Sequence, residues 1–141
     1  MPDILHRFFV KAGPEKVFSA FTTPAGLNAW WPLESAGKPA LNEIYRFYFG
    51  AEYDWRAKVI HTEPNKECTW QMTEAMHDWM PTQIGFALTP ERDGTAVYFF
   101  HNNWQQANEH FAISNFCWGQ LLQGLKNYCE TGIIVPFEKR N

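Results

Sequence analysis

Apolar and polar residues alternate with a period of two in several parts of the chain, which is typical of half-buried strands. The first run covers residues 4–11, where Ile4, Phe8 and Val10 share one face. Five further runs are joined by short connections, at residues 44–49, 54–59, 67–72, 84–88 and 95–101. Because short connections favour antiparallel neighbours, the pattern predicts a five-strand meander and one N-terminal strand, about six strands in all.

Between the first strand and the meander, the spacing becomes helical. Gly13-Pro14-Glu15 predicts the start of one short helix, since proline suits the first turn and glutamate favours its positive end. Thr23-Pro24 predicts a second short helix, which Pro32 ends. The stretch 33–41 contains Gly37 and Pro39, and we expect a loop there.

A long helix is predicted after the last strand, over residues of about 108–130, with Gly132 as its stop. About 20 residues make a rod of roughly 30 Å, enough to cross a small sheet. One broad stripe of this helix is apolar and consists of Phe111, Trp118, Leu121, Leu122, Leu125, Tyr128 and Cys129. Since the sheet can bury only one face, this helix is its cover, and the fold class is α+β.

Composition narrows the class of protein. Hydrophobic residues make up 45% of the 141 residues and charged residues 19%, so we expect one globular domain over residues 1–141. The net charge of −3 provides no general attraction to nucleic acid. No apolar run reaches the roughly 18 to 20 residues of a membrane span.

Cysteine usage and the N-terminus bear on the compartment. Residues 1–11 lack the continuous apolar run of a signal peptide. Cys68, Cys117 and Cys129 are odd in number and contain no CxxC pair, so a disulfide framework is not expected. We therefore expect a cytoplasmic protein.

At this point the residues match a known family. The segments that carry the match are Val10-Lys11-Ala12-Gly13-Pro14-Glu15-Lys16-Val17-Phe18, Thr23-Pro24 through Leu27 to Trp30-Trp31, Gly94-Thr95 with Val97, Phe99 and His101, and Trp118, Leu121, Leu125-Lys126 and Gly132. The chain resembles the START-like (SRPBCC) superfamily, and within it the activator of heat-shock-protein-90 ATPase homologue-1-like family. The resemblance implies the helix-grip (START/Bet v 1-like) fold, in which a curved antiparallel sheet wraps a long C-terminal helix. Two segments depart from the family's pattern: the Asn-, Gln- and His-rich loop 102–110 and the apolar tail 133–137.

The resemblance also implies a cavity between sheet and helix for an apolar or amphipathic small molecule. Bulky rings with a few polar tips are typical of such sites. The residues that we expect to line it are Trp31, Phe47, Trp55, Trp70, Phe86, Phe99, His101, Trp118 and Leu122. Two alternatives stay open, namely that these rings interlock as solid core, or that they enclose a small cavity without a physiological ligand.

Single residues allow two interpretations each. His101 could donate to a ligand carbonyl or phenol, or it could be a core histidine satisfied by backbone or water. Trp30 and Trp31 could gate a pocket mouth or anchor the short helix. His77-Asp78 is the one adjacent histidine–carboxylate pair, and we interpret it as part of a solvated loop.

No catalytic motif is found in the sequence. The five histidines have no tight ligand spacing and no Gly-x-Ser-x-Gly motif occurs, so we expect no metal, no cofactor and no catalytic residue. Cys117 and Cys129 lie on or beside the apolar stripe, where inert burial is the default.

Three functions remain as hypotheses. The first is a non-catalytic protein that binds an apolar or amphipathic small molecule, which includes lipids. The second, implied by the family name, is a heat-shock-protein-90 co-chaperone-like module with a role in stress. The third is a cyclase- or hydrolase-like enzyme that uses His101 or Tyr45 for acid–base chemistry in the same pocket. The chain is expected to be a monomer or a homodimer.

Overall fold

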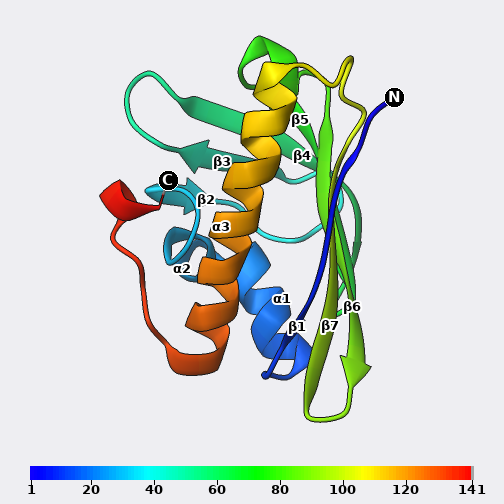
Figure 1. The fold of residues 1–141 in the computed structure, drawn as a ribbon, viewed down its shortest axis with the longest axis vertical. Helices are drawn as coiled ribbons and strands as arrows, with labels where there is room; N and C mark the ends of the chain where they lie inside the picture. Colours follow the sequence, from blue (N-terminus) through cyan, green and yellow to red (C-terminus); the bar gives the residue numbers. More distant parts are fainter. Residues whose placement is uncertain (141) are drawn as a thin grey trace.

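In the computed structural model, which describes residues 1–140, one antiparallel sheet curves around a long C-terminal helix (Figure 1). The strands are β1 (Ile4–Val10), β2 (Glu34–Ala36), β3 (Ile44–Tyr48), β4 (Asp54–Glu63), β5 (Glu67–Glu74), β6 (Gln83–Glu91) and β7 (Gly94–Asn102). The helices are α1 (Pro14–Thr22), α2 (Pro24–Asn28) and α3 (Glu109–Thr131), with short 3₁₀ turns η1 (His77–Trp79) and η2 (Phe137–Lys139). This is the α+β helix-grip arrangement that the sequence predicts.

The sheet has the strand order β1-β7-β6-β5-β4-β3-β2. Strands β3 to β7 form the expected meander, and β1 closes against β7, with Ile4 opposite His101. The strand count is seven, one more than predicted, because β2 lies in the stretch 33–41 that the sequence assigns to a loop. Its three residues pair with β3, with Ser35 opposite Phe47. A run this short has no period to recognise.

The starts of α1 and α2 and the end of α3 are set by the residues that the sequence predicts, and Asn108 caps the start of α3 in addition. Pro14 begins α1, and the Oγ1 atom of Thr23 accepts a hydrogen bond from the backbone N–H of Gly26 at 3.0 Å. The Oδ1 atom of Asn108 accepts from the N–H of Phe111 at 3.0 Å at the start of α3. Gly132 ends α3 in the left-handed region, at a φ of 77°.

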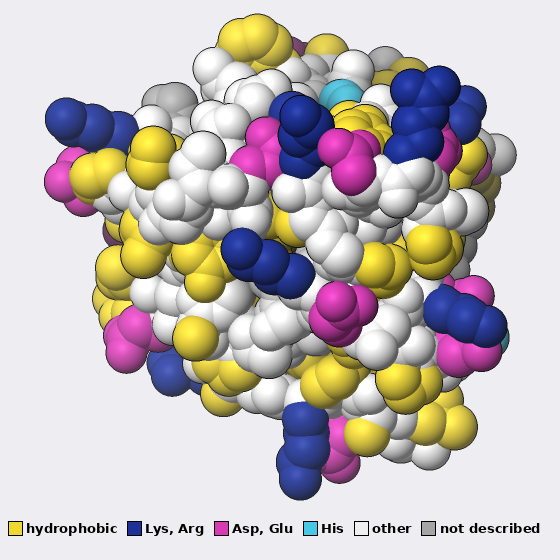
Figure 2. Space-filling model, turned by 90° about the horizontal axis from the view of Figure 1, so that it is seen from below, with side chains coloured by type: hydrophobic (Ala, Val, Ile, Leu, Met, Phe, Trp, Pro, Cys, Tyr) yellow, Lys and Arg dark blue, Asp and Glu magenta, His cyan; other side chains and the backbone are white. Residues whose placement is uncertain are grey.

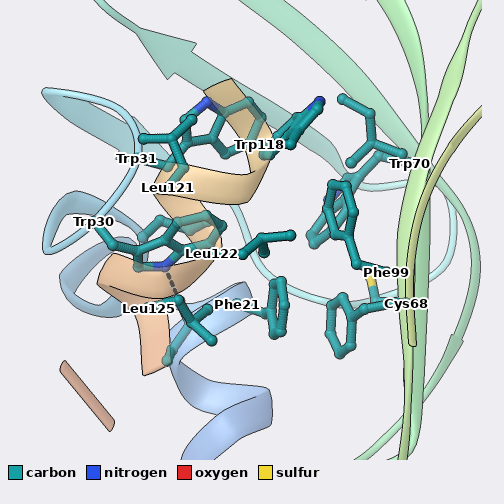
Figure 3. Close-up of a cluster of buried hydrophobic side chains, with 14 of the residues drawn as sticks. Phe21, Trp30, Trp31, Cys68, Trp70, Phe99, Trp118, Leu121, Leu122 and Leu125 are labelled. Carbon is teal, nitrogen blue, oxygen red and sulfur yellow. Dashed lines mark hydrogen bonds between the residues drawn. The ribbon is translucent and has the colours of Figure 1, made fainter. Parts of the chain in front are cut away.

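The centre of the grip is filled by interlocking side chains from α1, α2, α3 and the sheet (Figure 3). Phe21 of α1 stacks on Phe86 of β6 with ring centroids 4.0 Å apart. Trp30 is 2% exposed, and its indole N–H donates to the carbonyl of Ala20 at 2.9 Å. Trp30 is therefore an anchor for the α2 segment, one of the two interpretations that the sequence leaves open.

The surface carries mixed charge on the face drawn in Figure 2. Lys and Arg side chains are interspersed there with Asp and Glu, and hydrophobic side chains lie scattered between them. No helix within residues 1–140 is long and apolar enough to cross a membrane.

Candidate functional site

A cavity of about 340 Å³ lies beside the first half of α3, away from the filled centre of the grip. Three parts of the chain surround it: the tip of the β3–β4 hairpin, the connection that contains η1, and the C-terminal tail with η2. Figure 1 shows α3 between the sheet and this tail. The lining residues are Trp31, Phe49, Tyr53, Trp55, Met76, Trp79, His110, Ile113, Ser114, Cys117, Trp118, Leu121, Phe137 and Arg140.

One face of α3 forms a wall of the cavity. Ile113, Ser114, Cys117, Trp118 and Leu121 recur at intervals of three and four residues, so they project from the same side of the helix. Trp118 is 1% exposed whereas Ile113 is 54% exposed. The wall therefore runs from a buried floor to a solvent-exposed rim.

Aromatic rings form most of the remaining surface. The ring of Trp31 lies 5.0 Å from that of Trp118, and the ring of Trp55 lies 4.8 Å from that of Trp79. Phe49 lies 4.8 Å from Trp55 on the same hairpin. These spacings are those of favourable aromatic pairs, which hold the wall rigid and offer flat apolar surface to a ligand.

Three of the nine residues expected from the sequence line this cavity: Trp31, Trp55 and Trp118. Phe47, Trp70, Phe86, Phe99, His101 and Leu122 do not line it, and all six are at most 3% exposed. In Figure 3, Trp31, Trp118 and Leu121 lie toward one side, whereas Trp70, Phe99 and Leu122 point into the packed interior. Alternation along a strand predicts the inward face, but it does not show where along the sheet that face is covered by helices.

His101 lies in the core and both of its ring nitrogens have partners. The indole N–H of Trp118 donates to Nδ1 at 3.1 Å, so Nδ1 accepts and the proton resides on Nε2. Nε2 donates to the Oγ1 atom of Thr82 at 2.8 Å, and the Thr82 hydroxyl donates to the carbonyl of Trp79 at 2.6 Å. His101 is thus a core histidine, satisfied by side chains rather than by backbone or water.

Burial lowers the pKa of His101 to about 3, with a smaller contribution from His110. The unfolded chain takes up a proton near pH 6.5 that the native state does not accept until about pH 3. The contribution of His101 to stability is therefore complete above pH 6.5 and is lost as the pH falls toward 3, by up to about 1.4 kcal/mol per pH unit.

This sign leads to a prediction for acid unfolding. We expect the free energy of unfolding to fall more steeply for the wild-type chain than for His101→Gln, whose amide can replace both hydrogen bonds but does not titrate. The difference in slope corresponds to one proton. Urea unfolding measured from neutral pH down to about pH 4 checks it; parallel pH profiles for the two chains would contradict it.

Tyr45, the other acid–base residue considered from the sequence, is also in the core. Its side chain is 0% exposed, and its hydroxyl donates to the carbonyl of Thr22 at 2.6 Å. Burial raises the pKa of Tyr45 well above its ordinary value. Neither Tyr45 nor His101 lines the cavity, so neither is in a position to exchange protons with a molecule bound there.

A different histidine does reach the cavity. The Nδ1 atom of His110, at the start of α3, lies 3.0 Å from the Oδ2 atom of Asp78. Asp78 therefore pairs with a residue 32 positions away, rather than forming a site with its neighbour His77. The pair is a histidine oriented by a carboxylate, an arrangement that can transfer protons. No cluster of three or more metal-ligating side chains occurs in the described part of the chain.

Arg140 holds the C-terminal tail against the α2–β2 segment. Its Nε donates to the carbonyl of Val135 at 2.9 Å, and its Nη1 donates to those of Trp31 and Pro32 at 3.2 and 3.0 Å. Its Nη2 donates to the carbonyl of Asn28 at 2.7 Å. Burial lowers the pKa of Arg140, and the charge of Glu138 partly opposes this.

Sequence reasoning missed most of the rim. Phe137 is the last residue of the tail 133–137, whose apolar character departs from the family's pattern, and that departure was a usable signal. Cys117 and Leu121 could also have been predicted, because they lie on or beside the apolar stripe of the long helix. Tyr53, Met76 and Trp79 lie in connections, where no period indicates which way a side chain points.

Comparison with known proteins agrees with this architecture. The family model described as "Activator of Hsp90 ATPase homolog 1-like protein" matches residues 11–130. The Aha1 dimer from Colwellia psychrerythraea, solved in solution, is 35% identical with a TM-score of 0.85, and the alignment covers 94% of this chain and 98% of that one.

Two further solved structures show the same fold at lower identity. Protein SSP2350 from Staphylococcus saprophyticus is 20% identical with a TM-score of 0.80, over 95% of this chain and 96% of that one. CalU16 from Micromonospora echinospora is 19% identical with a TM-score of 0.73, over 92% and 77% of the two chains. No curated protein sequence matches the chain.

Proposed function

The chain belongs to the activator of Hsp90 ATPase homolog 1-like family of START-like proteins, and we propose that it binds an apolar or amphipathic small molecule in the cavity beside α3. The observation that carries the proposal is the cavity itself, a space of about 340 Å³ walled largely by aromatic and aliphatic side chains. Concave apolar sites with a few polar groups are the usual form of small-molecule sites.

The size and shape of the cavity indicate the size of its ligand. At roughly 30 Å³ for each non-hydrogen atom, the volume suits a molecule on the order of 10 to 15 such atoms. Trp79 and Trp118 are 7% and 1% exposed and form the floor, whereas Tyr53 and Met76 are 42% and 41% exposed and stand at the rim. A longer ligand would protrude past these rim residues into solvent.

The proposal assigns binding to the site, where the His110–Asp78 pair is also able to transfer protons. The two acid–base residues considered first, His101 and Tyr45, are fully buried and have partners in the core. We extend the proposal to a cytoplasmic protein, because three cysteines without a CxxC pair are typical of a reducing compartment.

A neutral fluorescent probe tests the proposal. N-phenyl-1-naphthylamine brightens when it moves from water into an apolar site, and we expect a saturable increase with one probe bound per chain. The aromatic walls supply the apolar environment that the probe needs. No increase with folded protein, verified by circular dichroism, would count against a ligand cavity.

A second candidate function follows from the family match over residues 11–130. As the family description suggests, the chain would then act on an Hsp90-type ATPase through its surface rather than through its cavity. An ATPase assay with purified chaperone separates the two candidates. Unchanged turnover in the presence of excess chain would remove this second candidate, and acceleration that survives blocking of the cavity would favour it.

We also propose a homodimer through the exposed side of α3 next to the cavity rim. Ile113, at that rim, and Phe116 are 54% and 69% exposed and lie about one helical turn apart, so they form an apolar surface that no element within residues 1–140 covers. The similar protein from Colwellia psychrerythraea is described as a dimer.

The dimer proposal predicts the effect of one charged substitution. Phe116→Asp is expected to convert a two-chain mass to a one-chain mass, because a carboxylate would be buried without a partner. Light scattering after size-exclusion chromatography measures the mass. Tyr98→Asp is the matched control, since Tyr98 is an exposed aromatic on β7 at 40% exposure. A single-chain mass for the wild-type chain would overturn the proposal.

A further inference from the structure

The residues among 1–140 that line the cavity include a positively charged side chain and no carboxylate. Among its lining residues in the described chain 1–140, Arg140 carries a permanent charge and none is aspartate or glutamate. His110 also lines it, and the Oδ2 atom of Asp78 lies 3.0 Å from Nδ1 of this histidine. The chain as a whole has a net charge of −3. The position of Arg140 at this cavity therefore needs an explanation of its own.

Arg140 is a buried cation that no carboxylate among residues 1–140 contacts directly, and Glu138 acts on it only from a distance. It is 8% exposed, and every hydrogen bond that the structure gives it runs to a backbone carbonyl. Four of the five guanidinium N–H groups are engaged in this way, which leaves one donor on Nη2. Carbonyl dipoles satisfy the donors, but they leave the full positive charge in place.

A buried charge that no carboxylate contacts is unfavourable, and an anion that reaches it gains more than it would in water. We therefore propose that the ligand of the cavity is an amphipathic carboxylate, a medium-chain or aromatic acid whose carboxylate accepts from Arg140 while its apolar part lies among the rings. This inference rests on the proposed function and adds the charge of the ligand. The other interpretation is that Arg140 only ties the tail to the α2–β2 segment.

Two ligands of equal length separate these interpretations on the unmodified chain. Decanoate and decanol differ in the head group, and at neutral pH decanoate is ionised. Their ability to displace N-phenyl-1-naphthylamine gives the relative affinities. Since a charge-assisted hydrogen bond is stronger than a neutral one, we expect decanoate to displace the probe at a concentration about tenfold or more below that of decanol.

Substitution of Arg140 then assigns the preference to this residue. In Arg140→Met the ratio between the two ligands is expected to fall to about one, through loss of decanoate affinity alone. Arg140→Lys keeps the charge without the planar fork, so it is expected to keep part of the preference. Glu138→Gln is the matched control in the same 3₁₀ turn, and it is expected to leave the preference intact or to raise it.

Each outcome decides one question. Equal displacement by decanoate and decanol on the wild-type chain overturns the anionic ligand and leaves the cavity standing. A preference for decanoate that persists in Arg140→Met overturns the assignment to Arg140. If Arg140→Met loses affinity for decanoate and decanol equally, Arg140 only ties the C-terminal tail to the α2–β2 segment and does not bind the carboxylate. If Arg140→Met does not fold, the comparison of decanoate with decanol on the wild-type chain and on Arg140→Lys still tests the proposed carboxylate ligand. Failure of the probe itself to bind would instead overturn the proposed function.

Discussion

His101→Ala is expected to lower the free energy of unfolding by about 3 to 5 kcal/mol. The substitution removes the acceptor of the Trp118 indole N–H and the donor to Thr82, and both groups are buried. It also leaves an empty space where the ring packs edge-on against Trp79, 4.6 Å away. The lost hydrogen bonds and the empty space destabilise the chain together.

Urea unfolding measures this loss, and His61→Ala is the control. The His61 side chain is 63% exposed, so its removal is expected to change stability by no more than about 0.5 kcal/mol. A loss below about 1 kcal/mol for His101→Ala would contradict the core role of the histidine.

Cys117→Trp is expected to weaken binding of the naphthylamine probe by about 100-fold or more while the chain stays folded. Cys117 lines the cavity from α3, and no hydrogen bond of its side chain is found in the described structure, so nothing polar is lost on substitution. An indole at this position would occupy much of the 340 Å³ available to the probe. Since the cavity extends to an exposed rim, the added ring has space and we expect a stability change within about 1.5 kcal/mol.

Cys117→Ala is the matched control, because it changes the same position without filling the space. Its probe affinity is expected to remain within about threefold of that of the wild-type chain. Equal binding by the tryptophan and alanine variants would show that the probe binds elsewhere on the molecule.

Much of the fold could be predicted because its signals are local. Pro14 and Glu15 at the start of α1, Thr23-Pro24 at the start of α2, Gly132 at the end of α3, and the period-two runs each act within a few residues of their own position. Strand β2 could not be predicted in this way, because three residues are too few to show a period. Their conformation depends on hydrogen bonding to β3, which is a tertiary contact.

The site was harder to predict than the fold, because it depends on how deeply each side chain is buried and on contacts between residues far apart in the sequence. Trp70 and Trp55 both lie on strands of the meander, yet Trp70 is covered within the core and Trp55 remains beside the cavity. The pairing of Asp78 with His110 joins residues 32 positions apart. The tail is the extreme case: Arg140 bonds to the carbonyls of Trp31 and Asn28, more than one hundred residues earlier, and no local pattern indicates that contact.

The most direct test of the account is a proton–nitrogen correlation spectrum of the labelled chain, recorded while N-phenyl-1-naphthylamine is added. We expect the indole signals of Trp31 and Trp55 and the backbone amide of Cys117 to shift and saturate together, because these groups surround the cavity. The amides of Val59 and Phe86, in the filled centre, are expected to stay in place. Shifts centred on Val59 and Phe86, or no shift at saturating probe, would contradict the placement of the binding site beside α3.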